Sequence, residues 1–340
     1  MKYRTLGSTG LQVSELSLGV MNFGDWANTD EAEAERVLST AIDAGVNLVD
    51  TADVYSKGDS ERILGKFLAK RSDRDELIVA TKFHSKWQPG INSHGNSRHW
   101  ITRAVEGSLQ RLGLDHIDLY QVHRPAPATD IDETLSALSD LVRAGKIRYF
   151  GTSTFSGHQL TEARLTAQIR GREYPVSEQL PYSILAREAE REVLDVARKY
   201  RLGVLVWSPL AGGWLAGASH ANGNSRIGRQ PERHTLDHEE NVTKLEVVEK
   251  LQKIADEASI TLPQLGLAFV LANRAVTTAL LGPRTLDQLT SLLPAVEIEL
   301  SAEVLAAVDA VSFPGRTINP ADTGYGRSKA LELVTKQRQP

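Results

Sequence analysis

Four polar residues follow short apolar runs of the sequence and could together move a proton. Asp50 and Tyr55 bound the segment DTADVY, Lys82 ends the run IVATK, and His123 ends the run DLYQVH. A free tyrosine has a pKa near 10, too high for an efficient acid at neutral pH. A lysine ammonium within hydrogen-bond reach favours the tyrosinate, and an aspartate keeps that lysine charged. A histidine beside them can steer a carbonyl oxygen or donate to it. The set predicts proton donation to a developing alkoxide, as in carbonyl reduction by hydride.

Taken singly, most of these residues have an ordinary structural explanation. A strand-end aspartate is commonly a helix cap, a loop tyrosine usually packs, and a lone histidine is commonly a core residue. Lys82 is the exception, because lysine is rare at the end of a strand that is buried on both faces. Four such residues at successive strand ends argue against coincidence. On spacing alone they predict a catalytic barrel for carbonyl or related chemistry.

The elements that must position these residues alternate along nearly the whole chain. Short β-branched runs predict eight strands: Glu15–Gly19, Asn47–Asp50, Leu77–Thr81, Ile117–Val122, Ile147–Gly151, Pro175–Glu178, Gly203–Trp207 and Thr277–Leu281. Amphipathic stretches between them predict helices that include Glu31–Ala44, His99–Leu112, Ile131–Arg143, Glu188–Tyr200, Val247–Ala258 and Leu286–Leu293. Strands that return through helices are parallel, and eight such units favour a closed (β/α)₈ TIM barrel over an open sheet. In such a barrel the active site lies at the carboxyl ends of the strands.

Three additions to the barrel are predicted within a single domain of residues 1–340. Tyr3–Leu6 and Gln12–Ser14 flank a Gly-Ser-Thr-Gly cluster and predict an N-terminal β-hairpin. Residues 216–240 lack periodicity and predict a long loop after the seventh strand. Residues 327–338, mixed in charge, predict a solvated C-terminal extension beyond the helical end of the barrel.

Composition excludes several classes of function. The net charge is −4 with both signs interspersed, which argues against a nucleic-acid surface. The absence of cysteine excludes disulfides, thiolate metal sites and cysteine nucleophiles. No stretch has the apolar core of a signal peptide or the ~20 apolar residues of a membrane span. We therefore expect a cytoplasmic protein without a membrane or nucleic-acid partner.

The motifs resemble those of the aldo-keto reductase family over residues 1 to about 310. DTADVYSKGDSERIL resembles the signature between that family's catalytic aspartate and tyrosine, and IVATKF its lysine strand. SLQRLGLDHIDLYQVHRP resembles the block that ends in the catalytic histidine, and ALSDLVRAGKIRYFGTSTF, SEQLPYSILAREAEREV and VWSPLAGG continue in family order. The resemblance implies that Asp50, Tyr55, Lys82 and His123 are catalytic. It extends to members such as potassium-channel β subunits and bacterial keto-deoxysugar reductases.

No G-x-G-x-x-G motif follows a strand, so a dinucleotide-binding domain of that kind is not expected. The resemblance instead implies NADPH as cofactor, bound across the barrel mouth. Arg284 stands at the position where members of the family contact the 2′-phosphate of NADPH, and arginine suits such a contact. Arg226 is a second candidate for binding this phosphate. The implied cofactor contacts are Gly19, Val20, Met21, Asp50, Ser153, Thr154, Gln179, Trp207, Ser208, Pro209, Leu210, Ala211, Gly212, Arg226, Gly282, Arg284 and Gln288. Two departures accompany them: Thr154 stands where many members have Asn, and Ser291-Leu292 replaces a Glu-Asn pair that binds adenine.

The predicted substrate is a small carbonyl compound in a mostly apolar pocket at the rim. Trp26, Trp87, Arg124 and Trp214 are the candidate contacts, with Met21 beside them, and Arg124 could attract an anionic or polyhydroxy substrate. His84, His94 and His99 match no metal-ligand spacing, so we expect a substrate loop there and no metal.

Three alternatives stay open on the sequence. They are a reductase of nucleotide-linked keto-deoxysugars, an enzyme that works mainly as an alcohol dehydrogenase, and a cofactor-sensing binding subunit. The oligomeric state is not predicted.

Overall fold

The computed structural model describes residues 1–27, 29–216 and 230–324. Its centre is a closed barrel of eight parallel strands in the order β10-β3-β4-β5-β6-β7-β8-β9. The strands are β3 (Leu16–Gly19), β4 (Leu48–Asp50), β5 (Ile78–Phe83), β6 (Ile117–Val122), β7 (Ile147–Ser153), β8 (Ser177–Pro181), β9 (Gly203–Trp207) and β10 (Val276–Leu281). The predicted TIM barrel is confirmed, and strands β6 and β9 have the predicted bounds.

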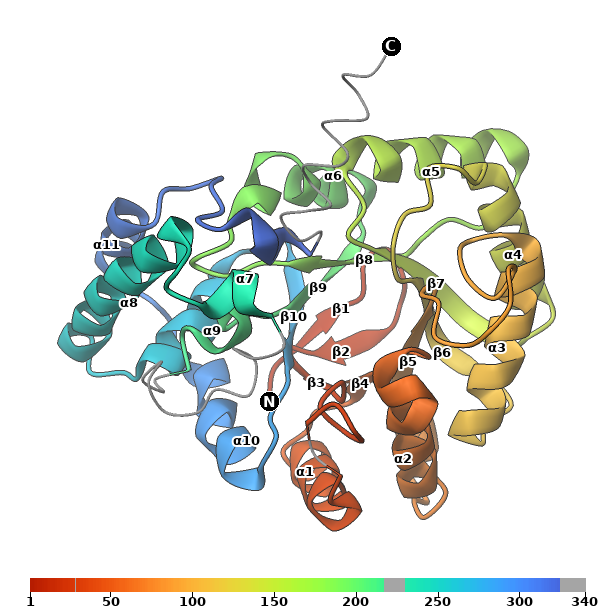
Figure 1. The fold of residues 1–340 in the computed structure, drawn as a ribbon, viewed down its shortest axis with the longest axis horizontal. Coiled ribbons are helices and arrows are strands. Elements are labelled where there is room, and N and C mark those ends of the chain that lie inside the picture. The colour runs from red at the N-terminus through yellow and green to blue at the C-terminus, as the bar shows by residue number, and fades with distance from the viewer. Residues whose placement is uncertain (28, 217–229, 325–340) are drawn as a thin grey trace.

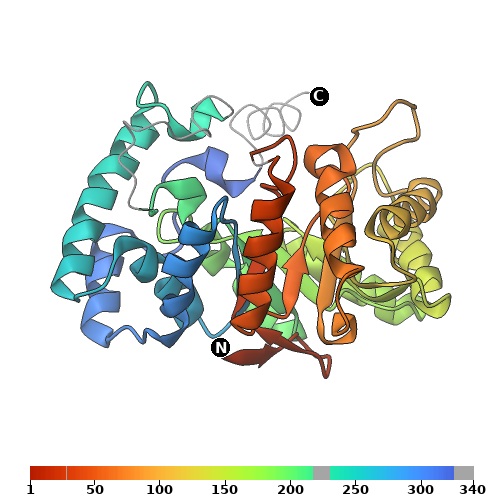
Figure 2. The ribbon, with the colours of Figure 1, turned by 90° about the horizontal axis from the view of Figure 1, so that it is seen from below.

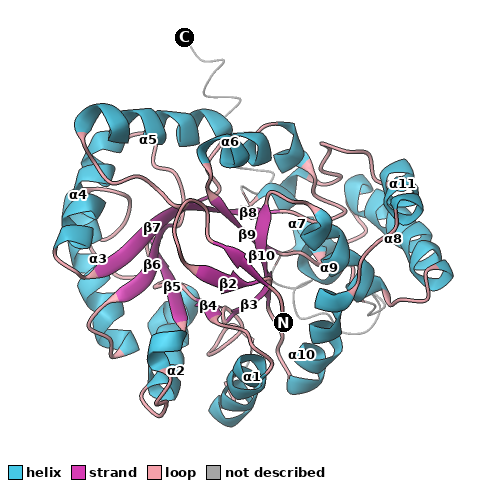
Figure 3. Cartoon of the chain, turned by 180° about the vertical axis from the view of Figure 1, so that it is seen from behind, coloured by secondary structure: helices cyan, strands magenta, loops and turns pink. Residues whose placement is uncertain are grey.

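Helices surround the barrel on all sides (Figure 3). They are α1 (Glu31–Asp43), α2 (Asp59–Leu68), α3 (Arg98–Leu112), α4 (Ile131–Arg143), α5 (Gly157–Arg170), α6 (Val193–Tyr200), α7 (Pro231–His234), α8 (Glu239–Glu257), α9 (Leu262–Ala272), α10 (Leu286–Leu292) and α11 (Ala302–Val311). Their starts follow sequence signals. Asp30 accepts hydrogen bonds from the backbone of Ala32 and Glu33, and Ser156 and Thr261 form capping boxes.

The N-terminal hairpin, also confirmed, closes the end of the barrel opposite the active site. Strands β1 (Tyr3–Thr5) and β2 (Gln12–Ser14) pair antiparallel below the barrel (Figures 1 and 2). Leu6 and Val13 of this hairpin are fully buried in the same cluster as the barrel-lining Leu48 and Leu205. Gly7 has φ +58°, and a side chain there would collide with the Val176 carbonyl. The hairpin therefore excludes water from one end and leaves the other as the only mouth of the barrel among the described residues.

Two helical segments differ from the sequence prediction. Glu188–Tyr200 is not one helix, because the chain breaks at Glu192 (φ −148°) between the 3₁₀ turn Glu188–Arg191 and α6. Of the predicted loop of residues 216–240, residues 217–229 lie outside the described part of the chain; its last part is helical, since α7 lies there and α8 begins at Glu239, eight residues before the predicted start. No apolar periodicity marks the first two turns of α8 in the sequence, because the inward-facing residues there, Asn241 and Lys244, are polar; both are fully buried and bond to distant parts of the chain.

The C-terminal part of the described chain runs back across the mouth. After α11 it pairs with the segment after β8, where Arg187 donates to the carbonyl of Ser312 and Ile318 to that of Leu185. It ends in the 3₁₀ turn Pro320–Thr323. The tail predicted at residues 327–338 lies outside the described residues. Among those that are described, no single helix is long and apolar enough to cross a membrane, although the bent pair Glu232–Glu257 and Leu262–Ala272 passes by length and composition.

Candidate active site

The barrel brings Asp50, Lys82 and Tyr55 together at its carboxyl end. Nζ of Lys82 donates to Oδ1 of Asp50 at 2.5 Å, to the carbonyl of Thr51 at 2.7 Å and to the Tyr55 hydroxyl at 3.3 Å. Lys82 is fully buried, and Asp50 nearly so. Burial opposes the charge on Lys82, but Asp50 and Tyr55 outweigh it and raise the pKa of Lys82 above its ordinary value. A buried, charged ammonium is thus aimed at the phenol.

The second oxygen of Asp50 is held from the opposite side. Gln179 donates to Oδ2 at 2.8 Å and Gln121 donates to it at 3.0 Å. Asp50 is the last residue of β4, Gln121 lies near the end of β6, and Gln179 lies in the middle of β8. Three strands therefore position one carboxylate. This carboxylate cannot rotate without losing both amide donors, and it fixes Lys82 in turn.

A strained turn carries Tyr55 out of the barrel wall. Ser56, Lys57 and Gly58 have φ of 48°, 54° and 89°, a run in the left-handed region that non-glycine residues rarely adopt. Ser56 Oγ donates to the carbonyl of Phe23 at 3.0 Å and accepts from the backbone of Trp26 at 3.1 Å. These contacts with the loop after β3 hold the turn, so that the Tyr55 ring meets Lys82 at 4.9 Å from its centroid.

His123 lies across from Tyr55. The two rings meet edge to face with centroids 5.7 Å apart. Burial, with Lys82, Arg124 and His84 nearby, lowers the pKa of His123 well below its ordinary value. His123 is therefore a neutral imidazole near neutral pH, able to donate one N–H to an oxygen in the pocket.

These residues open into one large cavity of about 680 Å³ at the barrel mouth. Tyr55, His123 and Asp50 line its floor, and Trp207 at the end of β9 forms part of one wall. Trp26 and Met21 line it on the side of the loop after β3, and Arg284 and Gln288 on the side of β10. The cavity extends from the catalytic residues to a rim that carries Arg124, Arg233 and Arg284, so it suits a long ligand with negatively charged groups.

The turn after β9 has an unusual backbone at the edge of this cavity. Ser208, Ala211, Gly212 and Gly213 all have positive φ, from 50° to 108°. Backbone turns of this kind form concave sites whose N–H groups bind anions. The geometry supports a phosphate-binding role for this turn.

Comparison with known proteins agrees with this geometry. The model of the aldo/keto reductase family matches residues 15–312. The chain is 41% identical to an uncharacterised oxidoreductase, YrpG, of Bacillus subtilis, over 93% of this chain and 97% of the relative. It is 35% identical to a probable voltage-gated potassium channel subunit beta of Oryza sativa (93% and 99%) and 33% identical to an aldo-keto reductase of Fusarium vanettenii (88% and 88%). The chain belongs to the aldo/keto reductase family. It is an oxidoreductase by that membership.

Most of the cofactor contacts expected for this aldo/keto reductase line the cavity. They are Gly19, Met21, Asp50, Ser153, Gln179, Trp207, Ser208, Pro209, Leu210, Gly212, Gly282, Arg284 and Gln288. Val20, Thr154 and Ala211 lie beneath this surface, and Thr154 accepts a hydrogen bond from Arg124. Ser291 and Leu292 both line the cavity, so the departure from the family pair is exposed to a ligand. Arg226 lies outside the described residues.

Two of the four expected substrate contacts are placed elsewhere. Trp26 and Arg124 line the cavity, whereas Trp87 and Trp214 do not. The ring of Trp87 packs under the guanidinium of Arg111 at 5.1 Å. Trp214 is buried, donates to the carbonyl of Arg233 and stacks on His234. Trp87 is half-buried and Trp214 is buried, and both indoles pack against neighbouring side chains instead of the cavity. Residue type alone does not give a side chain's direction.

The histidines of the loop after β5 are dispersed in this aldo/keto reductase. His84 Nδ1 lies 2.8 Å from Oδ1 of Asn96, and Asn96 donates to the carbonyl of Arg124 at 3.0 Å. His94 and His99 are exposed. The loop is therefore pinned to the rim beside His123, as suits a substrate loop.

Behind the active-site turn, Asp53 is buried away from the cavity. Burial, reinforced by Glu61, raises the pKa of its carboxyl to about 8, although the Trp87 side chain acts to lower it. Arg111, paired with Glu61 at 2.6 Å, opposes that rise only in part. Asp53 is thus an acid kept neutral two residues from Tyr55.

Sequence reasoning did not assign roles to Gln121, Asn22 or Ser56. Asn22 donates to the carbonyl of Gly282 at 2.7 Å and joins the loops after β3 and β10. Gln121 could have been noticed as a polar residue inside an otherwise apolar strand. No signal in the sequence distinguishes Asn22 or Ser56 from ordinary loop residues.

Proposed function

We propose that this aldo/keto reductase uses NADPH to reduce an aldehyde or ketone to an alcohol, with Tyr55 as the proton donor. The observation that carries the proposal is the buried Lys82 ammonium, which bonds both Asp50 and the Tyr55 hydroxyl at the floor of the cavity. An arrangement of this kind stabilises the negative charge that a phenol oxygen develops as it gives up a proton.

The residues around the cavity fit a nicotinamide dinucleotide. The flat ring of Trp207 offers a stacking surface near Ser153 and Gln179, whose polar groups suit a carboxamide. The positive-φ turn of residues 208–213 suits the diphosphate. Arg284, at the far edge, suits the 2′-phosphate that distinguishes NADPH from NADH.

When bound, the reduced nicotinamide supplies a hydride to the carbonyl carbon. Tyr55 gives its hydroxyl proton to the carbonyl oxygen, and the O–H bond of the alcohol forms as the phenolic O–H bond breaks. Lys82 stabilises the phenolate left behind, which solvent reprotonates. Neutral His123 donates an N–H to the carbonyl oxygen and orients it toward Tyr55, since charging this buried ring is unfavourable.

The mouth of the cavity indicates the kind of substrate. Trp26 and Met21 supply an apolar surface, and Arg124, next to His123, adds one cation. Arg124 is tied by Nη1 to the His123 carbonyl and to Thr154. A small carbonyl compound with an apolar body and a polar or anionic group fits this lining.

Loss of NADPH absorbance with a panel of aldehydes, ketones, α-dicarbonyls and nucleotide-linked keto-sugars tests the proposal. Turnover of at least one class, with a matching alcohol as product, is the expected result. A preference for the keto-sugars would favour the sugar-reductase alternative, and faster turnover with alcohols and NADP⁺ the dehydrogenase alternative.

A second candidate function is cofactor sensing as a binding subunit, favoured by the similarity to relatives named as potassium channel subunits. Tight NADPH binding with no turnover of any carbonyl in the panel would support it over the enzyme.

A further inference from the structure

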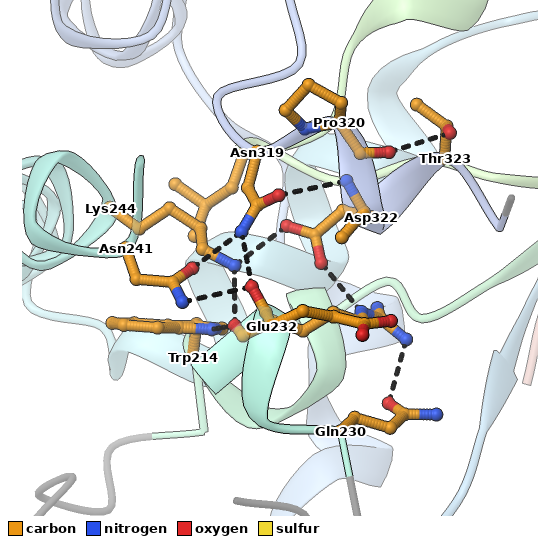
Figure 4. Close-up of polar contacts among 12 residues, drawn as sticks. Trp214, Gln230, Glu232, Asn241, Lys244, Asn319, Pro320, Asp322 and Thr323 are labelled. Carbon is orange, nitrogen blue, oxygen red and sulfur yellow. Dashed lines mark hydrogen bonds and ion pairs between the residues drawn. The ribbon is translucent and has the colours of Figure 1, made fainter. Parts of the chain in front are cut away.

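A buried charged cluster lies beside the cavity and joins two parts of the chain that are far apart in sequence. Asp322, of the 3₁₀ turn Pro320–Thr323, accepts from Nζ of Lys244 at 2.9 Å (Figure 4). It also accepts from Nε of Arg233 at 2.8 Å. The side chain of Asp322 is 3% exposed and that of Lys244 fully buried. We call Arg233, Lys244 and Asp322 the Asp322 cluster.

Neighbouring groups hold this cluster rigidly. Lys244 also donates to the carbonyl of Arg233 at 2.9 Å, and its ammonium lies 4.7 Å from the centroid of the Trp214 ring. Asn319 donates to the carbonyl of Glu232 at 2.9 Å and to Oδ1 of Asn241 at 2.8 Å (Figure 4). The end of the described chain is therefore fastened to α7 and α8 by polar contacts, which fix direction more closely than apolar packing does.

The cluster orients the guanidinium of Arg233 from two sides. Asp322 holds Nε, and Oε1 of Gln230 accepts from Nη1 at 3.0 Å. The remaining nitrogen, Nη2, has no hydrogen bond among the described residues and lies against the turn after β9. A methyl group built on Gly212 would be 3.4 Å from it. Arg233 and Gly212 both line the cavity.

The charges at this edge favour an anion. Within the cluster one carboxylate, Asp322, is shared between the cations Arg233 and Lys244, and Glu240 offsets part of the remaining positive charge at Lys244. Glu232 also lines the cavity, but its side chain is exposed to solvent, which screens it. Nη2 of Arg233 and the backbone N–H of Gly212, in the positive-φ turn, together offer donors to a bridging diphosphate.

We propose that Arg233 binds the diphosphate of the dinucleotide cofactor and that Asp322 is its positioning residue. The inference rests on the proposed function. It assigns the anionic middle of the cofactor to a side chain that the end of the described chain holds in place. The same turn also covers the nicotinamide wall, since a methyl group on Gly324 would lie 2.9 Å from the Trp207 ring.

Dissociation constants of purified variants for NADPH and for NADH, measured by calorimetry without substrate, test this proposal. Both cofactors carry the diphosphate, so Arg233→Gln is expected to weaken both by about tenfold, the loss of one charge-assisted contact. Arg284→Ala provides the contrast, because only NADPH carries the 2′-phosphate. Arg198→Gln is the matched control, an exposed arginine paired with Asp195 on α6.

Two further variants separate positioning from folding. Asp322→Asn is expected to weaken both cofactors several-fold, with no added loss when combined with Arg233→Gln. Because Asp322→Asn also leaves the buried Lys244 without its carboxylate, Gln230→Ala releases Arg233 from the other side without touching a buried charge. It is expected to give a smaller loss of the same pattern.

The outcomes distinguish this proposal from the proposed function. If wild type binds both cofactors and Arg233→Gln binds them within twofold of wild type, the diphosphate assignment is overturned while the reductase stands. A loss for NADPH alone would move Arg233 to the 2′-phosphate and also overturn the assignment. Additive losses in the double variant would overturn the role of Asp322. A wild type that binds neither cofactor would overturn both proposals.

Discussion

Replacing Lys82 by methionine should separate the catalytic role of this residue from its structural one. Lys82 is fully buried between Asp50 and Tyr55, and methionine has a similar length without the charge. The variant therefore removes the ammonium from both partners and keeps most of the packing.

The structure gives a magnitude for the catalytic loss. Nζ of Lys82 lies 3.3 Å from the Tyr55 oxygen. A unit charge at that distance stabilises a phenolate by about 5 kcal/mol at an effective dielectric constant of ~20. Since about 1.4 kcal/mol of barrier corresponds to a factor of ten in rate, kcat should fall by roughly 10³-fold or more.

The stability loss has a different cause and can be reversed. Without Lys82, the Asp50 carboxylate stays buried and lacks its cation, which costs about 3–5 kcal/mol of the free energy of unfolding. Asp50→Asn combined with Lys82→Met removes both charges, and the amide oxygen can still accept from Gln179. The double variant should recover most of the stability and none of the rate.

The assay pairs urea unfolding of each variant with steady-state NADPH oxidation on the best substrate of the panel. A folded Lys82→Met protein that retains more than a tenth of the wild-type kcat would refute the reasoning. Recovery of the rate in the double variant would refute it as well, because the defect would then be one of stability.

Three other predictions concern cofactor binding and the buried Asp53, which has no role in the proposed mechanism. Arg284→Ala should raise the Kd for NADPH by about tenfold and leave that for NADH nearly unchanged; equal losses would place the 2′-phosphate elsewhere. Ser291→Glu with Leu292→Asn should slow NADPH release in stopped flow by several-fold, since each added hydrogen bond to adenine contributes about 0.5–1.5 kcal/mol; an unchanged off-rate would mean that other groups already hold the adenine. Asp53 has a folded-state pKa of about 8 against an ordinary 3.8, so between those values the unfolded chain releases a proton that the folded protein keeps. The free energy of unfolding then falls by about 1.4 kcal/mol per pH unit, and the stability of Asp53→Asn relative to wild type should rise from pH 5 to pH 8; a constant difference would mean that Asp53 is ionised in the fold.

The barrel could be predicted from the sequence because its signals are local. Each strand is a short β-branched run, and the polar residue that ends it faces the mouth by the geometry of parallel strands. Asp50, Lys82 and His123 were placed in this way. Trp87 and Trp214 were not, since an indole has the same type whether it faces the cavity or packs behind it.

The charged cluster at the cavity edge shows what the sequence could not give. Asp322 lies 89 residues from Arg233 and 78 from Lys244, and each of the three looks like an ordinary surface charge in its own segment. Their contact depends on how the chain after α11 crosses the mouth. No periodicity or motif encodes that path, so only the fold reveals it.

The central claim is that Tyr55 supplies the proton for NADPH-dependent carbonyl reduction, and one paired measurement on Tyr55→Phe tests it most directly. Phenylalanine keeps the ring that packs beside His123 and removes the hydroxyl 3.3 Å from Lys82. Turnover and NADPH affinity are measured on the same preparation. We expect kcat to fall by at least roughly 10³-fold, about 4 kcal/mol of barrier, with the Kd for NADPH within about twofold of wild type. Retention of more than a tenth of the wild-type kcat, with the cofactor still bound, would contradict the assignment of Tyr55 as the acid.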